Sequence, residues 1–513
     1  MLRRRSCFAP MSDNPPKPPS TLARRLWTFL LPPAGLVLVW RRPGSVARKL
    51  LGTLLIVIYT PVWCVGVIAL LVLLRLAEIE WKGGTGPRLV HRRTVPDFDA
   101  LEASRREQTN APAPAGLPTA SSAYWTGYRG AKRDGHYEQQ PILTQWPEAG
   151  PKLLWKQPCG GGYASFAIAG GRAFTLEQRR DQESVVAYDV ASGRELWAFT
   201  YAGKFNDAWD MGGIGPRSSP AWDDGRVFAI GAQGQLHCVE AESGRLFWKR
   251  DLFVDNECKN LDFGMSASPL VVDDKVIVVA GAPTSRRGCG IAAYDKSTGA
   301  PLWKSQSDKQ AYNSPSLVTI AGQPQVLLVA GTRALAITPD DGKLLWEFPW
   351  SVSYDNHTAQ PVLLGGDRLF FSAGYGAGCV AIQVTKKRDA FNVTELWRNK
   401  NMKNKFTSSV FWQGHIYGLD EDILVCLDAE TGQRKWKDGR YGYGQVLLAS
   451  GHLIVMCGEG DLALVKATPD EHNEVARFPA LKGKTWNVPA LSDGRLLIRN
   501  GAEMACYDVS VKP

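Results

Sequence analysis

The stretch Ala187-Tyr-Asp-Val-Ala-Ser-Gly-Arg-Glu-Leu-Trp197 decides the fold of this chain. It predicts the end of one strand, a tight turn at Ser192-Gly193, and a second strand that closes on a tryptophan. The same eleven-residue pattern recurs in residues 238–248, 293–303, 336–346 and 426–436. Self-similarity at a period of roughly 40 to 50 residues is typical of a propeller or another repeat fold.

Each repeat contains four short strands separated by turn signals. In residues 218–251 the strands are Ser-Ser-Pro-Ala-Trp, Arg-Val-Phe-Ala-Ile, Gln-Leu-His-Cys-Val and Arg-Leu-Phe-Trp-Lys, with a glycine in each turn between them. Four-stranded units in a row predict propeller blades. One aromatic residue marks the last strand of each blade, and eight such residues predict eight blades: Trp155, Trp197, Trp248, Trp303, Trp346, Trp397, Trp436 and Phe478.

The two ends of the array predict how the ring closes. The strand at Trp155 has no three strands before it, and the chain ends in three strands, residues 487–490, 495–500 and 505–509, without a fourth. Joining them completes a blade and removes two sheet edges. We therefore predict an all-β, eight-bladed β-propeller with four-stranded antiparallel blades, formed by residues 124–513, closed by N- and C-terminal strands and preceded by a single transmembrane helix.

Positive charge is concentrated in the N-terminal arm. The first 49 residues contain ten Lys or Arg and one acid, Asp13, which leaves 50 basic and 49 acidic residues in the rest of the chain. The high isoelectric point therefore belongs to the arm, and the nearly neutral body argues against nucleic acid as a partner.

Residues 50–74 contain no charged side chain and predict a transmembrane helix. At about 1.5 Å a residue this helix would reach about 37 Å, more than the roughly 30 Å of a hydrocarbon core. The alternative is a cleaved signal peptide, but this apolar run is longer and starts far from the N-terminus. The apolar residues 26–40 carry Pro32 and Pro33 and predict a stretch at the membrane interface rather than a span.

The basic residues before the predicted helix indicate a cytoplasmic N-terminus, so we assign residues 1–49 to a basic cytoplasmic arm. Residues 75–123 are rich in Ala, Pro and Ser in their second half, and they predict an extracytoplasmic linker that cannot bury a core. In a bacterium the helix would lie in the inner membrane and the propeller in the periplasm.

Ten cysteines are spread through the chain without a Cys-x-x-Cys motif, so no zinc or redox signature follows. Several of them, such as Cys238 and Cys426, fit buried strand positions where sister repeats carry alanine. Cys159 and Cys258 fall in predicted loops and are the better candidates for a disulfide bridge in an oxidising space.

The repeat Asp-x-x-Ser/Thr-Gly-x-x-x-Trp resembles that of the pyrroloquinoline-quinone-type (PQQ-type) propellers, and the resemblance covers residues 124–510. That family includes quinoprotein alcohol dehydrogenases, which are enzymes, and the outer-membrane assembly scaffold BamB, which is not. In this topology we expect each terminal tryptophan to pack between neighbouring blades; the alternative is stacking on a cofactor. The chain has prolines at 220, 269, 315, 361 and 489. We expect them at the start of the innermost strands, because a strand at the edge of a sheet tolerates a residue without an N–H.

A functional site is expected at the channel mouth, on the loops that lead into the innermost strands. Those loops carry one or two polar or aromatic groups per blade. We predict that the ligand- or partner-binding residues are Arg217, Asn313, His357, Lys405 and Trp486. The alternative is a solvated rim without a ligand.

The resemblance leaves two functions open. A quinoprotein alcohol or polyol dehydrogenase would need PQQ, a calcium ion held by carboxylate and amide oxygens, and an aspartate base. The adjacent cysteine pair of those enzymes is missing from this chain, and only Asp262, Asn313 and Asp355 offer a conceivable ligand set. We therefore expect no catalytic residue, metal or cofactor, and instead a BamB-like scaffold, anchored in the membrane by residues 50–74, that binds another extracytoplasmic or membrane protein.

Overall fold

A computed structural model gives the structure of the protein and describes residues 32–41, 43–74, 77–81, 87–90, 95–110, 124–207 and 212–511. The chain divides into two compact units, one of residues 1–80 and 89–92 and one of residues 81–88 and 93–513. The predicted basic arm up to residue 31 lies outside the described residues.

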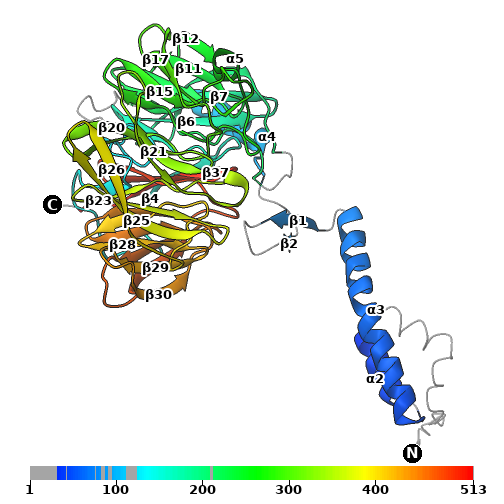
Figure 1. Ribbon diagram of the computed structural model, residues 1–513. Coiled ribbons are helices and arrows are strands. Elements are labelled where there is room, and N and C mark those ends of the chain that lie inside the picture. Colours follow the sequence, from blue (N-terminus) through cyan, green and yellow to red (C-terminus); the bar gives the residue numbers. More distant parts are fainter. Residues whose placement is uncertain are drawn as a thin grey trace, which may run out of the picture. The chain divides into compact units, whose positions relative to one another are not determined.

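Two helices form the described core of the first unit, α2 (Pro32–Arg41) and α3 (Val46–Leu73) (Figure 1). They contact each other, and the Trp40 indole donates a hydrogen bond of 3.0 Å to the Thr53 hydroxyl. Pro32 and Pro33 occupy the first positions of α2, where a missing N–H costs nothing. Residues 26–31 lie outside the described residues, and the placement of residues 26–40 at the membrane interface stays a prediction.

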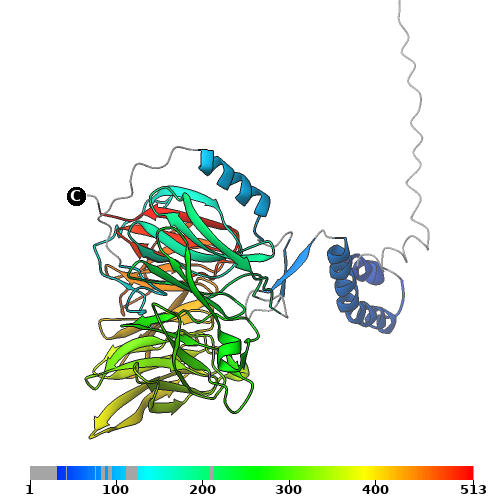
Figure 2. The same cartoon turned by 90° about the horizontal axis from the view of Figure 1, so that it is seen from above.

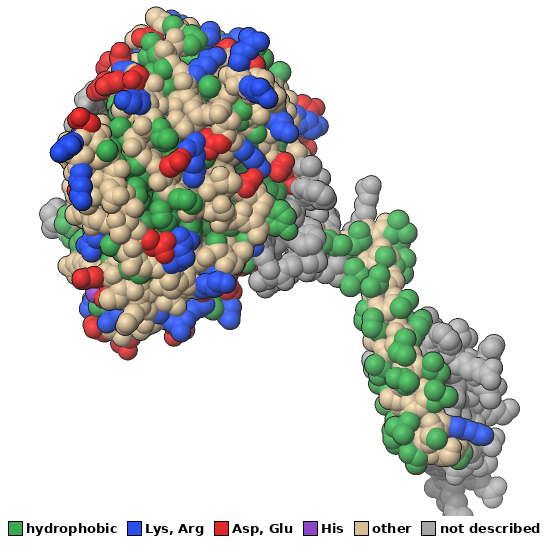
Figure 3. Space-filling view, viewed as in Figure 1, with side chains coloured by type: hydrophobic (Ala, Val, Ile, Leu, Met, Phe, Trp, Pro, Cys, Tyr) green, Lys and Arg blue, Asp and Glu red, His purple; other side chains and the backbone are tan. Residues whose placement is uncertain are grey.

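Helix α3 is long and apolar enough to cross a membrane, and it begins four residues before the predicted span. Hydrophobic side chains cover its visible surface in Figure 3. Pro61 lies inside the helix, as membrane helices tolerate. The structure thus provides one candidate membrane span among the described residues.

The segment predicted as a linker contains regular structure. Strands β1 (Glu78–Trp81) and β2 (Pro87–Val90) form a two-stranded sheet, and α4 (Phe98–Asn110) packs against the propeller (Figure 2). Leu101 is buried, Arg180 of the propeller lies 2.7 Å from Asp99, and Arg105 lies 2.8 Å from Glu195. The prediction of a linker without regular structure was wrong for residues 78–81, 87–90 and 98–110, because α4 docks through ion pairs that leave no hydrophobic pattern in the sequence. The extracytoplasmic placement of residues 75–123 stays a prediction.

Eight blades, each of four antiparallel strands, form the propeller, as predicted; in one blade a short strand outside the repeat adds a fifth strand in parallel. Within each blade the innermost strand pairs with the second, the second with the third and the third with the outermost, and the innermost strands of neighbouring blades contact one another. From the innermost strand outward, blades 1 to 4 are β5 (Ala167–Ala169), β6 (Arg172–Arg179), β7 (Gln182–Asp189) and β8 (Glu195–Ala202); β9 (Ala221–Asp223), β10 (Arg226–Ile230), β11 (Gln235–Glu240) and β12 (Leu246–Asp251); β14 (Leu270–Val272), β15 (Lys275–Val279), β17 (Ile291–Asp295) and β18 (Pro301–Ser305); and β19 (Ser316–Ile320), β20 (Gln323–Val329), β21 (Arg333–Ile337) and β22 (Leu344–Pro349).

Blades 5 to 8 follow around the ring (Figure 1). They are β23 (Val362–Gly365), β24 (Arg368–Ala373), β25 (Gly378–Lys387) and β26 (Ala390–Asn399); β27 (Val410–Trp412), β28 (His415–Asp420), β29 (Ile423–Asp428) and β30 (Arg434–Arg440); β31 (Gln445–Ala449), β32 (His452–Met456), β33 (Asp461–Lys466) and β34 (Glu474–Pro479); and β35 (Ala490–Ser492), β36 (Arg495–Arg499), β37 (Glu503–Asp508) and β4 (Lys152–Pro158). Smaller elements are β3 (His136–Tyr137), which pairs in parallel with β31, and α5 (Leu252–Asn256), β13 (Cys258–Lys259), β16 (Ala282–Pro283) and η1 (Ser353–Asp355).

The predicted closure of the ring is confirmed. Strand β4, from the N-terminal side of the array, is the outer strand of the blade whose other three strands end the chain, and Trp155 pairs with Cys506. The hydrogen bonds of this pairing join residues separated by almost the whole propeller. With this pairing, every blade has its four strands.

The terminal tryptophans lie between neighbouring blades, as expected. Six indole N–H groups donate to a main-chain carbonyl in the next blade, at 2.8 to 3.2 Å: Trp155 to Val190, Trp197 to Ala241, Trp248 to Lys296, Trp303 to Pro339, Trp397 to Ala429 and Trp436 to Thr468. Trp346 instead donates to the side chain of Gln325, because the long β25–β26 hairpin replaces the turn in the next blade.

A ring of buried side chains joins the innermost strands. In blades 1 to 5 the N–H at this position donates to the side chain at the same position of the next blade, at 2.7 to 3.0 Å. The residues joined in this way are Ser165, Ser219, Ser268, Ser314, Gln360 and Ser408. Prolines 220, 269, 315 and 361 follow members of this ring and directly precede innermost strands. The ring therefore fixes the blades around the channel by polar contacts, while apolar clusters fill the space between blades.

The disulfide considered for Cys159 and Cys258 does not form. Both thiols are free and buried, and they belong to two different apolar clusters of the propeller. The Cys159 thiol donates to the Asn500 carbonyl at 3.4 Å, whereas that of Cys258 donates to the Cys289 carbonyl at 3.3 Å.

Candidate functional site

A segment that precedes the first blade fills the centre of the propeller. We call residues 124–137 the plug segment. Its Arg129 donates hydrogen bonds to the carbonyls of Val446 and Ser409 at 3.1 and 3.2 Å. Arg133 donates to the carbonyls of Ser268, Pro269 and Pro315. These acceptors lie at the innermost strands of four blades, so the two guanidinium groups tie the plug segment across the channel and satisfy carbonyls that no further strand can pair.

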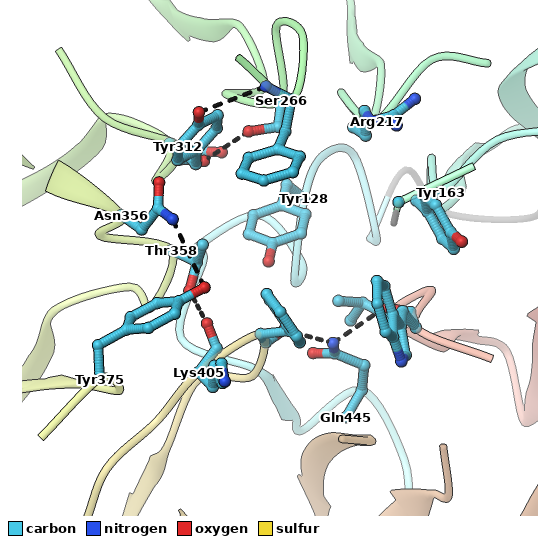
Figure 4. A pocket seen from close by; sticks show the side chains of 16 residues that line it. Tyr128, Tyr163, Arg217, Ser266, Tyr312, Asn356, Thr358, Tyr375, Lys405 and Gln445 are labelled. Carbon is cyan, nitrogen blue, oxygen red and sulfur yellow. Dashed lines mark hydrogen bonds between the residues drawn. The ribbon is translucent and has the colours of Figure 1, made fainter. Parts of the chain in front are cut away.

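A cavity of about 430 Å³ opens at the channel mouth, and all eight blades contribute to it. Tyr128 of the plug segment lies in the middle of the view in Figure 4, with side chains of the surrounding loops around it. The lining residues are Tyr128, Tyr163, Gly212, Arg217, Phe263, Ser266, Tyr312, Ser314, Asn356, Thr358, Tyr375, Lys405, Phe406, Gln445, Trp486 and Val488.

Aromatic rings stack along one part of the wall. The Trp486 ring lies between those of Tyr163 and Phe406, with centroids 5.5 and 4.7 Å away and interplanar angles of 28° and 26°. Phe406 also meets Tyr443 edge-on at 5.7 Å. The Lys484 ammonium lies 4.4 Å from the centroid of the Trp486 ring, so Trp486 already stacks with two aromatic rings and contacts a cation within the protein.

The Arg217 guanidinium is one of two cationic groups on the wall. It lies 4.5 Å from the ring centroid of Phe205, donates to the Gly213 carbonyl at 2.7 Å, and lies 3.4 Å from Asp207. Burial lowers the pKa of Arg217 below its ordinary value, and Tyr163 and Asp207 partly offset this effect. Arg217 is therefore a charged, preorganised donor in a poorly solvated place.

Lys405 is the second cation and lies on the other side of Tyr128 in Figure 4. Its ammonium lies 4.6 Å from the ring centroid of Tyr375, 5.4 Å from that of Tyr443 and 3.9 Å from the Glu421 carboxylate. Burial lowers the pKa of Lys405, and Glu421 raises it. Among the described lining residues there is no Asp or Glu, so the wall itself carries positive charge.

The structure brings three of the five predicted binding residues onto this wall: Arg217, Lys405 and Trp486. It does not place Asn313 or His357 there, and both are only 2% exposed. The Asn313 amide exchanges hydrogen bonds with the main chain of Val329, and the His357 ring packs near Trp350, where burial lowers its pKa to about 4.

The wrong prediction for Asn313 and His357 has a simple cause. Successive side chains of an extended segment point to opposite sides. Tyr312 and Ser314, on either side of Asn313, therefore line the cavity. So do Asn356 and Thr358, on either side of His357. Sequence reasoning also missed Tyr128, because it precedes the first blade, outside the repeat. Tyr163 and Gln445 were detectable only by their position just before or at an innermost strand.

The ligand set considered for calcium does not assemble. Asn313 is buried, Asp262 is exposed, and Asp355 lies 3.1 Å from Lys309. In the part of the chain that the structure describes, no three His, Cys, Asp or Glu side chains are grouped so that they could hold a metal ion. The donor set on the cavity wall thus does not fit calcium, which prefers several carboxylate and carbonyl oxygens.

Comparison with known sequences gives a consistent family. The family model described as outer membrane protein assembly factor BamB matches residues 181–438, just over half of the chain. BamB of Shewanella oneidensis is 22% identical over 376 residues, which cover 61% of this chain and 89% of that protein. BamB of Burkholderia pseudomallei is 23% identical over 284 residues, which cover 52% of this chain and 65% of that protein.

Solved structures share the fold. The quinohemoprotein alcohol dehydrogenase ADHIIG from Pseudomonas putida HK5 matches with a TM-score of 0.53 and 12% identity, over 76% of this chain and 81% of that one. BamB from Moraxella catarrhalis matches with a TM-score of 0.49 and 15% identity, over 71% of this chain and all of that one. The structural likeness supports the propeller fold alone. Because the family model matches half of its sequence, the chain belongs to the PQQ-like propeller family described as outer membrane protein assembly factor BamB.

Proposed function

We propose that this protein is a membrane-anchored extracytoplasmic scaffold, and that its propeller holds a protein partner by a segment inserted into the mouth cavity. The observation that carries the proposal is the cavity itself, to which every blade contributes and which has two buried cations on its wall. Its volume of about 430 Å³ lies in the range of small-ligand pockets and accommodates a few side chains rather than a domain surface.

The charge of the wall indicates the chemistry of that segment. Arg217 and Lys405 are held by aromatic rings and are partly desolvated, so an anionic group between them would gain charge-assisted hydrogen bonds in a medium of low dielectric. We therefore infer that the inserted segment carries an acidic side chain. The relatives are named outer membrane protein assembly factors, which supports a protein partner in the cell envelope.

Anchoring rests on α3 and on the charge of the N-terminal arm. An apolar helix of this length favours a single membrane span. Eight basic residues before it, and Arg48 and Lys49 in its first turn, favour a cytoplasmic N-terminus. In this arrangement the inner membrane holds α3, and the propeller lies in the periplasm.

The test is partner capture from membranes with the full-length chain in mild detergent. Lys405→Gln removes one cation from the mouth, whereas Lys343→Gln, at an exposed turn of blade 4, removes the same charge elsewhere. A hydrogen bond to a charged group contributes about 1.5–3 kcal/mol, so we expect Lys405→Gln to weaken capture by about tenfold or more. Capture of a stoichiometric partner that is unchanged by Lys405→Gln would contradict the use of the mouth, and a chain recovered without a partner would contradict the scaffold.

The alternative is a PQQ- and calcium-dependent alcohol or polyol dehydrogenase. Its support is the fold shared with a quinohemoprotein alcohol dehydrogenase. The lining does not offer a calcium donor set among the described residues. Titrating the purified chain with the quinone and calcium, and measuring dye reduction with alcohols, decides this alternative: an absence of tight quinone binding would end it.

A further inference from the structure

A second cavity, of about 400 Å³, lies at the other end of the channel. The segments that line the mouth at Ser314, Thr358 and Phe406 lead into β19, β23 and β27, and residues of these three innermost strands line the second cavity. It is lined by Arg129, Lys132, Arg133, Asp134, His136, Ser316, Leu317, Val318, Thr319, Leu327, Gln360, Pro361, Val362, Leu363, Ser409 and Phe411. The plug segment runs from Tyr128 in the first cavity to His136 in the second and separates the two.

One part of this lining is cationic. Arg129 and Arg133 are only 1% and 5% exposed, and their hydrogen bonds join them to main-chain carbonyls rather than to carboxylates. The Arg129 Nε–H is buried and has no hydrogen-bond partner among the described residues. Burial lowers the pKa of Arg133 to about 10, which reflects the cost of placing a cation in this poorly solvated site.

The other charges of the lining do not cancel these cations. Asp134 is the one carboxylate among the described lining residues, and its side chain accepts the N–H of His136 at 2.9 Å. Lys132 lies at the exposed rim, 2.9 Å from Glu138. Burial lowers the pKa of His136, which disfavours the charged form of its ring. Two buried guanidinium groups therefore face one carboxylate inside the cavity, and Lys132 lies at its rim beside Glu138.

The rest of the lining is apolar. Leu317 and Leu363 project from the innermost strands of blades 4 and 5 and are 42% and 41% exposed, and Val362 and Phe411 lie beside them in the lining. An alkyl chain that packs against these exposed leucines, next to the buried cations, would be removed from water, which stabilises binding by about 25 cal/mol for each Å² of apolar surface buried.

We propose that this second cavity binds a small amphipathic anion, in which a carboxylate or phosphate group faces Arg129, Lys132 and Arg133 and an alkyl chain lies against Leu317 and Leu363. The anion supplies the counter-charge that the buried guanidinium groups lack, and oxygen acceptors are the groups that a guanidinium pairs with best. This site is separate from the mouth, so it does not depend on the proposed scaffold function.

The test is isothermal titration of the full-length chain in nanodiscs, with empty nanodiscs as the blank. The probes are hexanoate and hexyl phosphate, which carry the anion and the chain; hexanol, which lacks the anion; and acetate and inorganic phosphate, which lack the chain. We expect hexanoate, hexyl phosphate or both to bind, at least about tenfold more tightly than the three partial probes. The ratio of hexanoate to hexyl phosphate affinity identifies the preferred anionic group.

Variants at exposed positions keep the test independent of folding. Lys132→Glu and Leu363→Gln are each expected to weaken binding of the better probe by about tenfold, and Lys343→Glu, at a distant exposed turn, to leave it unchanged. The proposal is overturned if neither hexyl probe binds, if hexanol binds as tightly as the anions, or if both cavity variants bind like the parent chain while keeping its circular dichroism and unfolding midpoint.

Discussion

The indole of Trp248 should stabilise the contact between blades 2 and 3 through both its volume and its N–H. The ring is buried, donates to the Lys296 carbonyl at 3.1 Å, and covers Gly299 in the turn of the next blade. Trp248→Ala removes the whole ring from a packed site, so we expect a loss of about 3–5 kcal/mol in the free energy of unfolding. Trp248→Phe keeps most of the ring and loses the hydrogen bond, which should cost about 1 kcal/mol.

The facing glycine gives a sharper version of this test. A Cβ at Gly299 would lie 2.6 Å from an indole carbon of Trp248, and the residue has φ +72°. Gly299→Ala should therefore cost about 1–3 kcal/mol from crowding and a further 1–2 kcal/mol from the left-handed backbone. In a Trp248→Ala background the crowding disappears, and only the backbone cost should remain.

The measurement is guanidinium unfolding of the full-length chain in detergent, followed by circular dichroism so that loss of a tryptophan does not change the signal. Leu246→Ala, in the same strand but at a half-exposed position, is the control and should cost less than about 1 kcal/mol. If Trp248→Ala costs no more than this control, or if Gly299→Ala is equally costly in both backgrounds, the tryptophan does not dock as described.

Three further predictions follow from the ring of buried side chains, from α4 and from a buried histidine. Ser268→Ala leaves the buried N–H of Ser219 without an acceptor and should cost about 1–3 kcal/mol of unfolding free energy; an unchanged denaturation midpoint would contradict the role of the ring. Arg180→Glu places a negative charge beside Asp99, so amide hydrogen exchange in α4 should accelerate while the global free energy of unfolding changes by less than about 1 kcal/mol. Unchanged exchange would mean that other contacts hold the helix. Since burial lowers the pKa of His357 to about 4, the unfolded state takes up a proton first as the pH falls. Stability should therefore fall between about pH 6.5 and pH 4, less steeply in a His357→Phe variant; equal slopes would exclude this histidine as a source of acid sensitivity.

The number of blades could be read from the sequence because each blade is built from local hairpins. The turn glycine and the tryptophan of the fourth strand lie four residues apart in the sequence, as Gly193 and Trp197 do, and this spacing recurs in every regular repeat. Even the closure of the ring could be predicted from a local feature of the sequence, because the strand at Trp155 has no three strands before it. The tryptophan prediction held for the same reason, since six of the seven indoles donate to a main-chain carbonyl of the adjoining blade and Trp346 is the exception.

Tertiary structure alone decided what fills the channel and what faces the mouth. Arg129 contacts the Val446 carbonyl across 317 positions of the chain, and no pattern within the plug segment indicates such a contact. Likewise α4 docks through charges whose partners lie far along the chain.

The sequence by itself therefore determined an eight-bladed ring, an apolar helix before it and the set of loops at its mouth. It could not determine which side chains of those loops reach the cavity. The extended backbone alternates its side chains, so a shift of one residue separates Tyr312, on the wall, from Asn313, buried behind it. That choice depends on how eight blades meet around one axis.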